Sequence, residues 1–177
     1  MSGFWWLLGF VVCQRLAELW IARRNAAWMK ERGAVESGQR HYPLAVALHT
    51  AFFVSLTLEV LALHRQPAWW WPAPFALFVL AQALRYWCIL TLGRFWNTRI
   101  LVLPGAPLIR RGPYRLLRHP NYLAVALELL TIPLIFHAYF TALLFSLLNL
   151  VFLAIRISRE EQALSAGVNN SEFIHLK

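Results

Sequence analysis

The sequence has little cysteine, with two residues among 177. Cys13 and Cys88 both lie inside apolar runs, where a free cysteine behaves as a small buried hydrophobe. Two isolated cysteines without clustered ligands argue against a disulfide framework and against a zinc site. We therefore expect no bound metal.

Charge is also scarce, since 14% of the residues are charged whereas 59% are hydrophobic and the mean hydropathy is +0.51. This composition is too apolar for an ordinary soluble domain and is typical of a small multi-pass membrane protein. The tryptophans gather near the ends of apolar runs, as expected for rings at a lipid–water interface. The length predicts one domain, residues 1–177.

Five apolar runs predict an all-α integral membrane fold with about five transmembrane helices. The first three, each about 20 residues or longer, are long enough to cross about 30 Å of hydrocarbon. The last two are shorter and are separated by His137-Ala138, which predicts a tight helical hairpin distorted by Pro133. The first run lacks the features of a cleavable signal peptide. The runs span about Gly3 to Ala22, Pro43 to Leu63, Trp69 to Leu92, Pro120 to Phe136 and Tyr139 to Ile155.

The net charge of +9 raises the question of nucleic-acid binding, which we exclude because the cations lie in loops between apolar runs. We expect membrane lipids as partners instead. The positive-inside rule places the N-terminus outside and the C-terminus in the cytoplasm, in the inner or plasma membrane if the source is bacterial. The side predicted to be cytoplasmic carries 14 of the 17 Lys and Arg residues: Arg23, Arg24, Lys30, Arg32, Arg40, Arg94, Arg99, Arg110, Arg111, Arg115, Arg118, Arg156, Arg159 and Lys177.

The loop from Gly93 to His119 is too long for a simple connector. Its apolar patches, Ile100 to Leu103 and Leu108-Ile109, flank the turn signal Pro104-Gly105. We predict two short extended segments around this turn that fold back along the membrane face. The chain thus divides into three N-terminal helices (1–92), a loop, hairpin and C-terminal segment (93–165) and a polar tail (166–177).

Ionisable groups inside apolar helices are costly and often functional. Arg15 and Glu18 lie three residues apart, which predicts a structural ion pair. Glu128 lies two turns inside the fourth run and requires a partner or a pocket. Asn149 likewise requires a partner or a pocket, and we favour a hydrogen-bonded bridge between helices. His49, Gln82 and Arg85 suit either a polar network or a substrate site, and Glu59 is close enough to the outer end to reach water.

The segment RRGPYRLLRHPNY, from Arg110 to Tyr122, is a dense polar island at the start of the fourth run. Pro120 suits the first position of a helix, and the N–H groups of the next two residues are then expected to be unpaired. Such a helix start, with His119 and Tyr122 beside it, is suited to a carboxylate or phosphate group. The alternative is an anchor for anionic headgroups, which explains the arginines but not the other residues.

A second polar set, Arg156, Arg159, Glu160 and Glu161, follows the fifth run. Arg156 and Glu160 have the spacing of an ordinary surface pair. In a hairpin, however, the end of the fifth run returns to the membrane face where the fourth begins. The convergence of two polar sets favours a site over a lattice of salt bridges.

At these residues the chain resembles the isoprenylcysteine carboxyl methyltransferase family of integral-membrane enzymes that use S-adenosyl-L-methionine. The resemblance is carried by GPYRLLRHPNY, an apolar hairpin and RISREEQAL, and it covers about Leu92 to Leu164. The RHPNY element is shared with membrane phospholipid methyltransferases and sterol reductases. Ala124 stands where many members have glycine, and the C-terminal tail lacks the family's usual Tyr-rich, basic ending.

The resemblance implies a cytosol-facing cofactor pocket made by the last two helices, the preceding loop and the C-terminal segment. Glu160 corresponds to a glutamate that binds the cofactor's amino group, and Arg156 to an arginine that faces the acceptor's carboxylate. Leu108 and Ile109 would give backbone contacts to the adenosine end. The implied cofactor-binding residues are Leu108, Ile109, Tyr114, His119, Pro120, Asn121, Tyr122 and Glu160.

The leading hypothesis is therefore O-methylation of a lipophilic acceptor, either an isoprenylcysteine-type carboxylate or a long-chain phenol or polyketide. A carboxylate needs orientation by Arg156 and no base, whereas a phenol must lose a proton, for which Glu128 or His119 is a candidate. The alternatives are a membrane reductase of the sterol-reductase type that uses NADPH, and a non-catalytic lipid-binding membrane protein.

Overall fold

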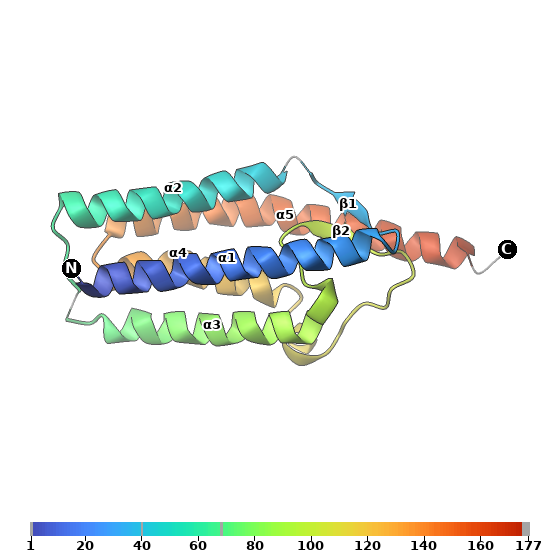
Figure 1. Cartoon of the computed structure of the whole chain (residues 1–177), viewed down its shortest axis with the longest axis horizontal. Helices are drawn as coiled ribbons and strands as arrows, with labels where there is room; N and C mark the ends of the chain where they lie inside the picture. Colours follow the sequence, from blue (N-terminus) through green and yellow to red (C-terminus); the bar gives the residue numbers. More distant parts are fainter. Residues whose placement is uncertain (1, 40, 68, 175–177) are drawn as a thin grey trace. The chain divides into compact units, whose positions relative to one another are not determined.

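The computed structural model describes residues 2–39, 41–67 and 69–174, so Arg40 and Lys177 of the predicted charge pattern lie outside the described residues. Helices dominate this part of the chain (Figure 1). In chain order the elements are α1 (Ser2–Lys30), β1 (Val35–Ser37), α2 (His41–Ala62), α3 (Pro72–Leu92), the 3₁₀ helix η1 (Gly93–Phe95), β2 (Ile100–Val102), the 3₁₀ helix η2 (Gly112–Arg115), α4 (Pro120–Ile135) and α5 (Tyr139–Ile174).

Four of these helices, α1, α2, α3 and α5, are long and apolar enough to cross a membrane. The shorter α4 has 16 residues, a rise of about 24 Å at 1.5 Å per residue, which is less than the hydrocarbon thickness. The prediction of an all-α integral membrane protein is confirmed, and so is the short first limb of the hairpin.

Two helices are longer than their apolar runs. α1 continues through Arg23 and Arg24 to Lys30, and α5 continues from the apolar run through Arg156 and Glu160 into the tail as far as Ile174. The predicted end of the last helix near Ile155 is therefore wrong. Hydropathy marks where a helix leaves the apolar layer, whereas the backbone hydrogen bonding continues into the polar segment.

The chain divides into two compact units. Unit 1 combines Met1–Tyr42, Leu92–Arg110 and Arg156–Lys177. Unit 2 combines Pro43–Thr91 and Arg111–Ile155.

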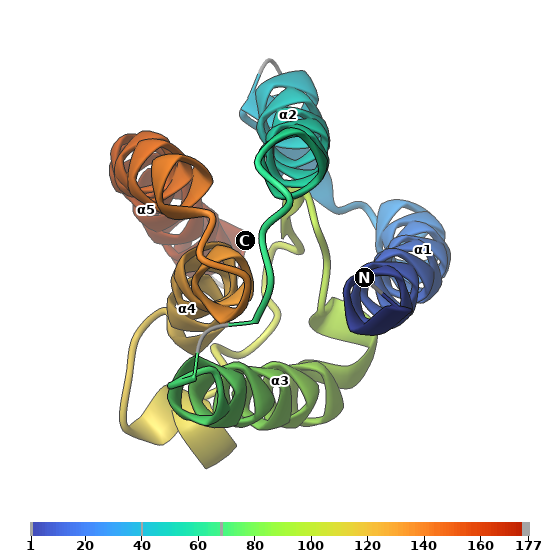
Figure 2. The ribbon, with the colours of Figure 1, turned by 90° about the vertical axis from the view of Figure 1, so that its left-hand side faces the viewer.

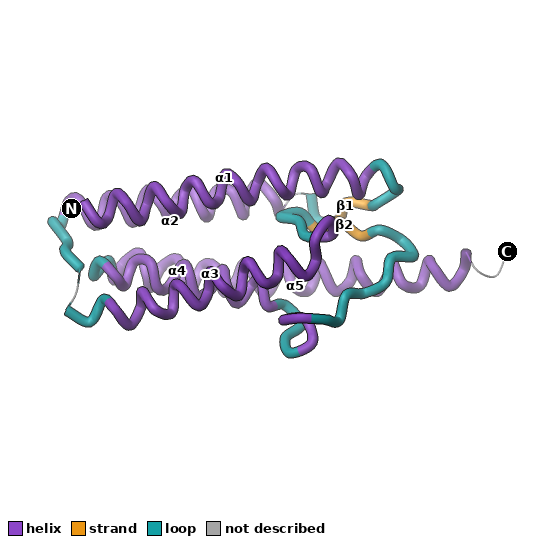
Figure 3. The backbone as a smooth tube through the Cα atoms, turned by 60° about the horizontal axis from the view of Figure 1, so that its bottom comes forward, coloured by secondary structure: helices purple, strands orange, loops and turns teal. Residues whose placement is uncertain are grey.

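In unit 1, the extended segment predicted before the Pro104-Gly105 turn exists as β2. β2 pairs antiparallel with β1 from the first loop, with Glu36 opposite Leu101 (Figure 3). Arg99 Nη1 and Lys30 Nζ donate hydrogen bonds of 2.7 Å and 2.6 Å to the Glu36 carboxylate. The pairing partner of β2 is thus a strand of the first loop, whose Glu36 carboxylate lies between two cations.

Side-chain amides tie the segment after α3 to α1 in the same unit. Asn25 Nδ2 donates to the carbonyl oxygens of Gly93 and Trp96 at 3.1 Å and 2.7 Å. Asn97 Nδ2 donates in return to the Ala22 carbonyl at 3.2 Å. These bonds satisfy carbonyls at helix ends that would otherwise lack a donor. The predicted ion pair between Arg15 and Glu18 is also present, at 2.5 Å.

In unit 2, α4 lies between α3 and α5, and α2 lies beside α5 (Figure 2). Glu59 of α2 accepts hydrogen bonds from the N–H groups of Phe140 and Thr141 at 3.2 Å and 2.8 Å. The expectation that Glu59 simply reaches water is therefore wrong, because its carboxylate caps the positive end of α5. One turn away, the Ser55 and Thr141 hydroxyls lie 2.8 Å apart.

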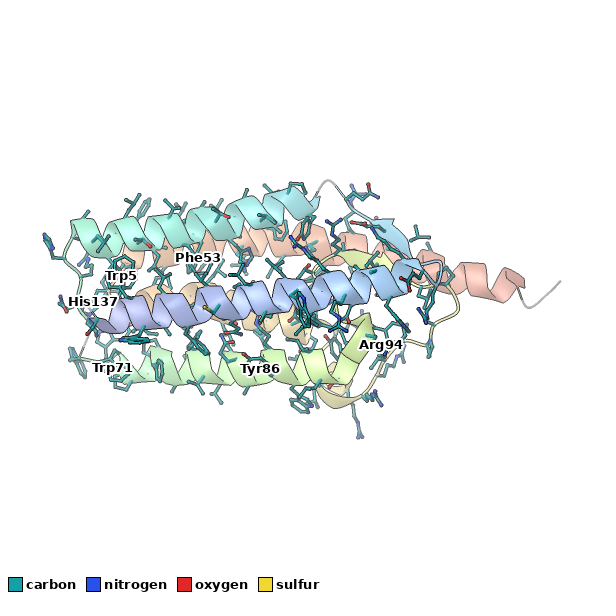
Figure 4. All side chains as sticks on the ribbon, in the orientation of Figure 1. Trp5, Phe53, Trp71, Tyr86, Arg94 and His137 are labelled. Atoms are coloured by element: carbon teal, nitrogen blue, oxygen red, sulfur yellow. The ribbon has the colours of Figure 1, made fainter. Side chains whose placement is uncertain are left out.

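The connection between α4 and α5 is as tight as predicted. His137 adopts a positive φ of 56°, and the N–H groups of Phe136 and Ala138 both donate to the Pro133 carbonyl at 3.0 Å. Figure 4 shows His137 at the same end of unit 2 as Trp71, which immediately precedes α3. This end of the unit is thus rich in aromatic rings, as expected at a membrane interface.

The Glu36 cluster predicts a loss of stability in acid. Desolvation raises the pKa of Glu36, but hydrogen bonds and charges from Lys30 and Arg99 outweigh it and hold the pKa below its ordinary value of 4.5. The stabilisation is complete above that value and is lost as the pH falls through the lower folded-state pKa. Because both cations are partly exposed, we expect about 1 kcal/mol or less.

Thermal unfolding in detergent between pH 7 and pH 3 tests this expectation. Glu36→Gln should unfold at a lower temperature than the wild type at neutral pH, and the difference should vanish in acid. Glu31→Gln is the matched control, because the Glu31 side chain is 73% exposed. A difference between Glu36→Gln and the wild type that is constant with pH would contradict the linkage.

Candidate functional site

The candidate residues fall in both units. Tyr114, Glu128 and the segment from His119 to Tyr122 belong to unit 2, whereas Leu108, Ile109, Arg156 and Glu160 belong to unit 1. Their convergence on one cofactor stays a prediction.

The turn that precedes α4 requires glycine. Gly112 has a φ of +56°, and a Cβ atom there would lie 2.6 Å from Thr91 Oγ1 and 3.1 Å from Trp87 Nε1. A side chain would therefore strain the backbone and also displace the turn from the end of α3. The buried Pro113 and the hydrogen bond between the Tyr114 and Cys88 side chains complete this contact. Tyr114 is thus held against α3 by a fixed turn.

The start of α4 agrees with the prediction in most respects. Pro120 is buried at the first helical position, and His119 is the N-cap, whose ring stacks on Tyr122 at 5.6 Å between centroids and 20° between planes. The prediction of an unpaired Tyr122 N–H is wrong, because this group donates to the His119 carbonyl at 3.1 Å. The first turn is tightened by this three-residue bond, as is common at helix ends.

Asn121 keeps unused hydrogen-bonding capacity at this helix start. Its Oδ1 atom is buried and has no hydrogen-bond partner within residues 2–39, 41–67 and 69–174. Buried polar atoms in native proteins are nearly always paired, so a partner outside the protein is implied. A carbonyl oxygen beside the positive end of a helix suits a ligand that carries both a donor and an anionic group.

The candidate residues of unit 1 differ strongly in exposure. Arg156 is only 9% exposed, and its Nη2 atom donates to the Thr98 carbonyl at 2.5 Å. Glu160, one turn further along α5, is half-buried, whereas the neighbouring Arg159 is exposed. The side chain of Leu108 is 49% exposed, which leaves its predicted backbone role unaffected. Arg156 is therefore the fixed cation of this group.

Glu128 has the partner that its position requires. Its Oε1 atom accepts hydrogen bonds from Gln82 Nε2 at 2.7 Å and Arg85 Nε at 2.8 Å, and its Oε2 atom accepts from Arg85 Nη2 at 2.5 Å. All three side chains are buried. Both carboxylate oxygens are engaged, so Glu128 would have to release part of this pair before it could accept a proton.

Comparison with known proteins decides the family. The model of the isoprenylcysteine carboxyl methyltransferase (ICMT) family matches residues 74–166, more than half of the chain. The chain belongs to the ICMT family. The match includes α4, the turn at Gly112 and the polar segment of α5, so every predicted site residue lies inside it. Together with its long apolar helices, membership makes this protein a membrane methyltransferase.

Two bacterial relatives resemble this ICMT-family chain over most of its length. The uncharacterized protein YpbQ of Bacillus subtilis is 46% identical over 161 residues, which cover 91% of this chain and 96% of the relative. An uncharacterized protein of Haemophilus influenzae is 29% identical over 156 residues, which cover 88% and 91%. No solved structure matches the chain.

Sequence reasoning left Gln82 and Arg85 open, although their spacing of three residues places them on one face of α3. That spacing was the available signal for a pair of donors facing one acceptor. The spacing could not identify Glu128 as the hydrogen-bond acceptor, because Glu128 is separated from Arg85 by 43 residues.

The buried pair of this ICMT-family protein predicts a marked effect on stability. Glu128→Leu should destabilise the protein by about 3–5 kcal/mol, because it leaves the Arg85 charge buried and unpaired. The double variant Arg85→Met/Glu128→Leu should recover most of that loss, because both charges are then absent. Unfolding in detergent measures both effects.

The isosteric variant Glu128→Gln separates this structural role from a role as a base. If Glu128 is also a base, the folded fraction of Glu128→Gln should lose methyl transfer, whatever its unfolding temperature. If its role is structural alone, the variant should have a lower unfolding temperature and its folded fraction should retain activity.

Proposed function

We propose that this protein is an S-adenosyl-L-methionine-dependent O-methyltransferase that acts on a lipophilic acceptor. The observation that carries the proposal is the ICMT-family match over residues 74–166, which contains both polar segments of the candidate site. The buried, unpaired Oδ1 atom of Asn121 supports it independently, because it supplies a hydrogen-bond acceptor at a helix start.

The side chains present fit the cofactor chemically. The positive start of α4, with His119, suits the cofactor's carboxylate, and the Oδ1 acceptor of Asn121 suits an ammonium N–H. The Glu160 carboxylate suits its ammonium group. Tyr114, Pro120 and Tyr122 would frame the cofactor, and the backbone of Leu108 and Ile109 would contact the adenosine end.

When bound, the cofactor supplies an electrophilic methyl group on a sulfonium. The protein must then position an oxygen of the acceptor in line with that group and exclude water. Arg156 suits this task, because its buried guanidinium is fixed by the Thr98 carbonyl. For a carboxylate acceptor, orientation and desolvation suffice. A phenol or enol acceptor must also lose its proton, and His119 is the better candidate base because both Glu128 oxygens already accept hydrogen bonds.

The predicted topology is consistent with this chemistry. With the N-terminus outside and the C-terminus in the cytoplasm, the start of α4 and the polar part of α5 would meet a water-soluble cofactor on the cytosolic side. The acceptor would enter from the lipid.

Cofactor binding in detergent tests the site. His119→Ala and Glu160→Ala should each weaken S-adenosyl-L-methionine binding at least tenfold, because each removes a polar contact to a charged group of the ligand. Arg115→Ala and Arg159→Ala are matched controls, since both arginines are exposed neighbours of the proposed contacts. The controls should bind as the wild type does.

Normal affinity in both test variants would refute the site assignment. The same assay with NADPH examines the reductase alternative, and a lack of saturable binding of either ligand would favour a lipid-binding protein. Transfer of a labelled methyl group to prenylcysteine, phospholipid and alkylphenol acceptors in parallel then identifies the acceptor class.

A further inference from the structure

Asn149 is an unusual residue of α5. It is 1% exposed, and neither its Nδ2 nor its Oδ1 atom has a hydrogen-bond partner in the described part of the chain. The predicted bridge between helices is therefore wrong, because no side chain or backbone group on a neighbouring described helix meets this amide. A buried carboxamide with both ends unpaired is rare in native proteins and is more costly still inside a membrane.

Several other buried polar side chains of unit 2 have hydrogen-bond partners. Thr131 Oγ1 donates to the Leu127 carbonyl at 2.7 Å, and the Thr141 hydroxyl pairs with that of Ser55. The buried Glu128 carboxylate accepts hydrogen bonds from Gln82 and Arg85. Asn149 differs from these side chains because both polar atoms of its amide lack a hydrogen-bond partner among the described residues.

The position of Asn149 on α5 relates it to the proposed site. Arg156 and Glu160 follow it by seven and eleven residues, spacings that return to the same face of a helix with 3.6 residues per turn. At 1.5 Å per residue, Asn149 lies about 10 Å further along the axis than Arg156, toward the apolar middle of the helix. Phe145 and Phe152, both buried, flank it on this face. Asn149 therefore lies in the apolar part of α5, where a lipophilic acceptor would meet it.

A second unpaired group adjoins this position. Ser146 precedes Asn149 by one turn, and its Oγ atom is also buried without a hydrogen-bond partner among the described residues. Residues three apart are neighbours on a helix surface. The hydroxyl and the carboxamide together offer donors and acceptors but no charge.

We propose that Asn149 binds an uncharged polar group of the lipophilic acceptor, one that both donates and accepts a hydrogen bond. This inference rests on the proposed function, and it adds a specificity-determining residue and a chemical class to it. The Nδ2 atom donates to an oxygen of the acceptor, and Oδ1 accepts from its hydroxyl. A carboxylate could accept a hydrogen bond from Nδ2 but has no donor for Oδ1. The Oδ1 atom would then face the lone pairs of the carboxylate oxygens. The two unpaired atoms of the amide thus favour an acceptor that carries a hydroxyl group.

Equilibrium binding of a long-chain alkylphenol to the full-length protein in lipid nanodiscs tests this proposal. The wild type should bind the alkylphenol saturably. Asn149→Leu, of similar size, should bind it at least tenfold more weakly, bind S-adenosyl-L-methionine normally and unfold at the same or a higher temperature. The higher temperature is expected because the variant removes an unpaired buried amide.

Two further variants complete the comparison. Asn149→Asp keeps the shape but loses the N–H donors, so it too should weaken alkylphenol binding if the leucine variant fails to fold. Thr141→Val is the matched control on the buried face of α5, and it should lower the unfolding temperature without changing alkylphenol affinity.

The outcomes separate this proposal from the proposed function. No saturable alkylphenol binding by the wild type, or equal binding by Asn149→Leu, would overturn the assignment even if S-adenosyl-L-methionine binds normally. A lower unfolding temperature of Asn149→Leu with unchanged alkylphenol binding would identify a structural amide, held for example by a buried water. Failure of S-adenosyl-L-methionine binding, with Asn149-dependent alkylphenol binding intact, would remove the methyltransferase proposal and leave the acceptor site.

Discussion

Inside hydrocarbon, a polar group can be satisfied only by another group of the protein or by a ligand, because water is absent. Much of this structure follows from that constraint. Glu128 lies buried with Arg85 and Gln82 and joins α4 to α3, while Glu59 caps the start of α5 and joins it to α2. These carboxylates hold the hairpin of α4 and α5 within unit 2 by directional hydrogen bonds. Apolar packing alone would hold it less well, because lipid tails are as apolar as the side chains that they would replace.

The same constraint separates structural from functional polarity. A polar residue that closes its hydrogen bonds within the protein has an adequate structural explanation, as Thr131 and Thr141 do. Asn121 and Asn149 retain unpaired buried atoms and therefore point to chemistry outside the chain. The sequence patterns do not make this distinction, because Asn121 lies in a family motif whereas Asn149 lies in an apolar run. The arginines near the helix ends carry less functional information, since topology and contacts such as that of Arg32 with the Trp28 ring account for them.

Sequence reasoning predicted the helices well because apolar runs of membrane length leave few alternatives. It missed the extension of α5, since hydropathy falls at Arg156 although the backbone stays helical to Ile174. It also missed the pairing of β1 with β2, because Glu36 and Arg99 are 63 residues apart and three-residue strands carry almost no pattern. For the site, residue types and their motif were predictable. The hydrogen bond of the Tyr122 N–H was not, because it depends on the exact pitch of the first helical turn.

The unbroken course of α5 has a consequence for how the sequence can vary. Because Asn149, Arg156 and Glu160 share one helix, a single inserted or deleted residue between them would rotate one part of the set by about 100° relative to the other. No loop between Tyr139 and Ile174 is available to absorb such a change. Length variation among functional relatives should therefore be excluded from this interval and confined to the connections on either side of it, where the described chain leaves its helices.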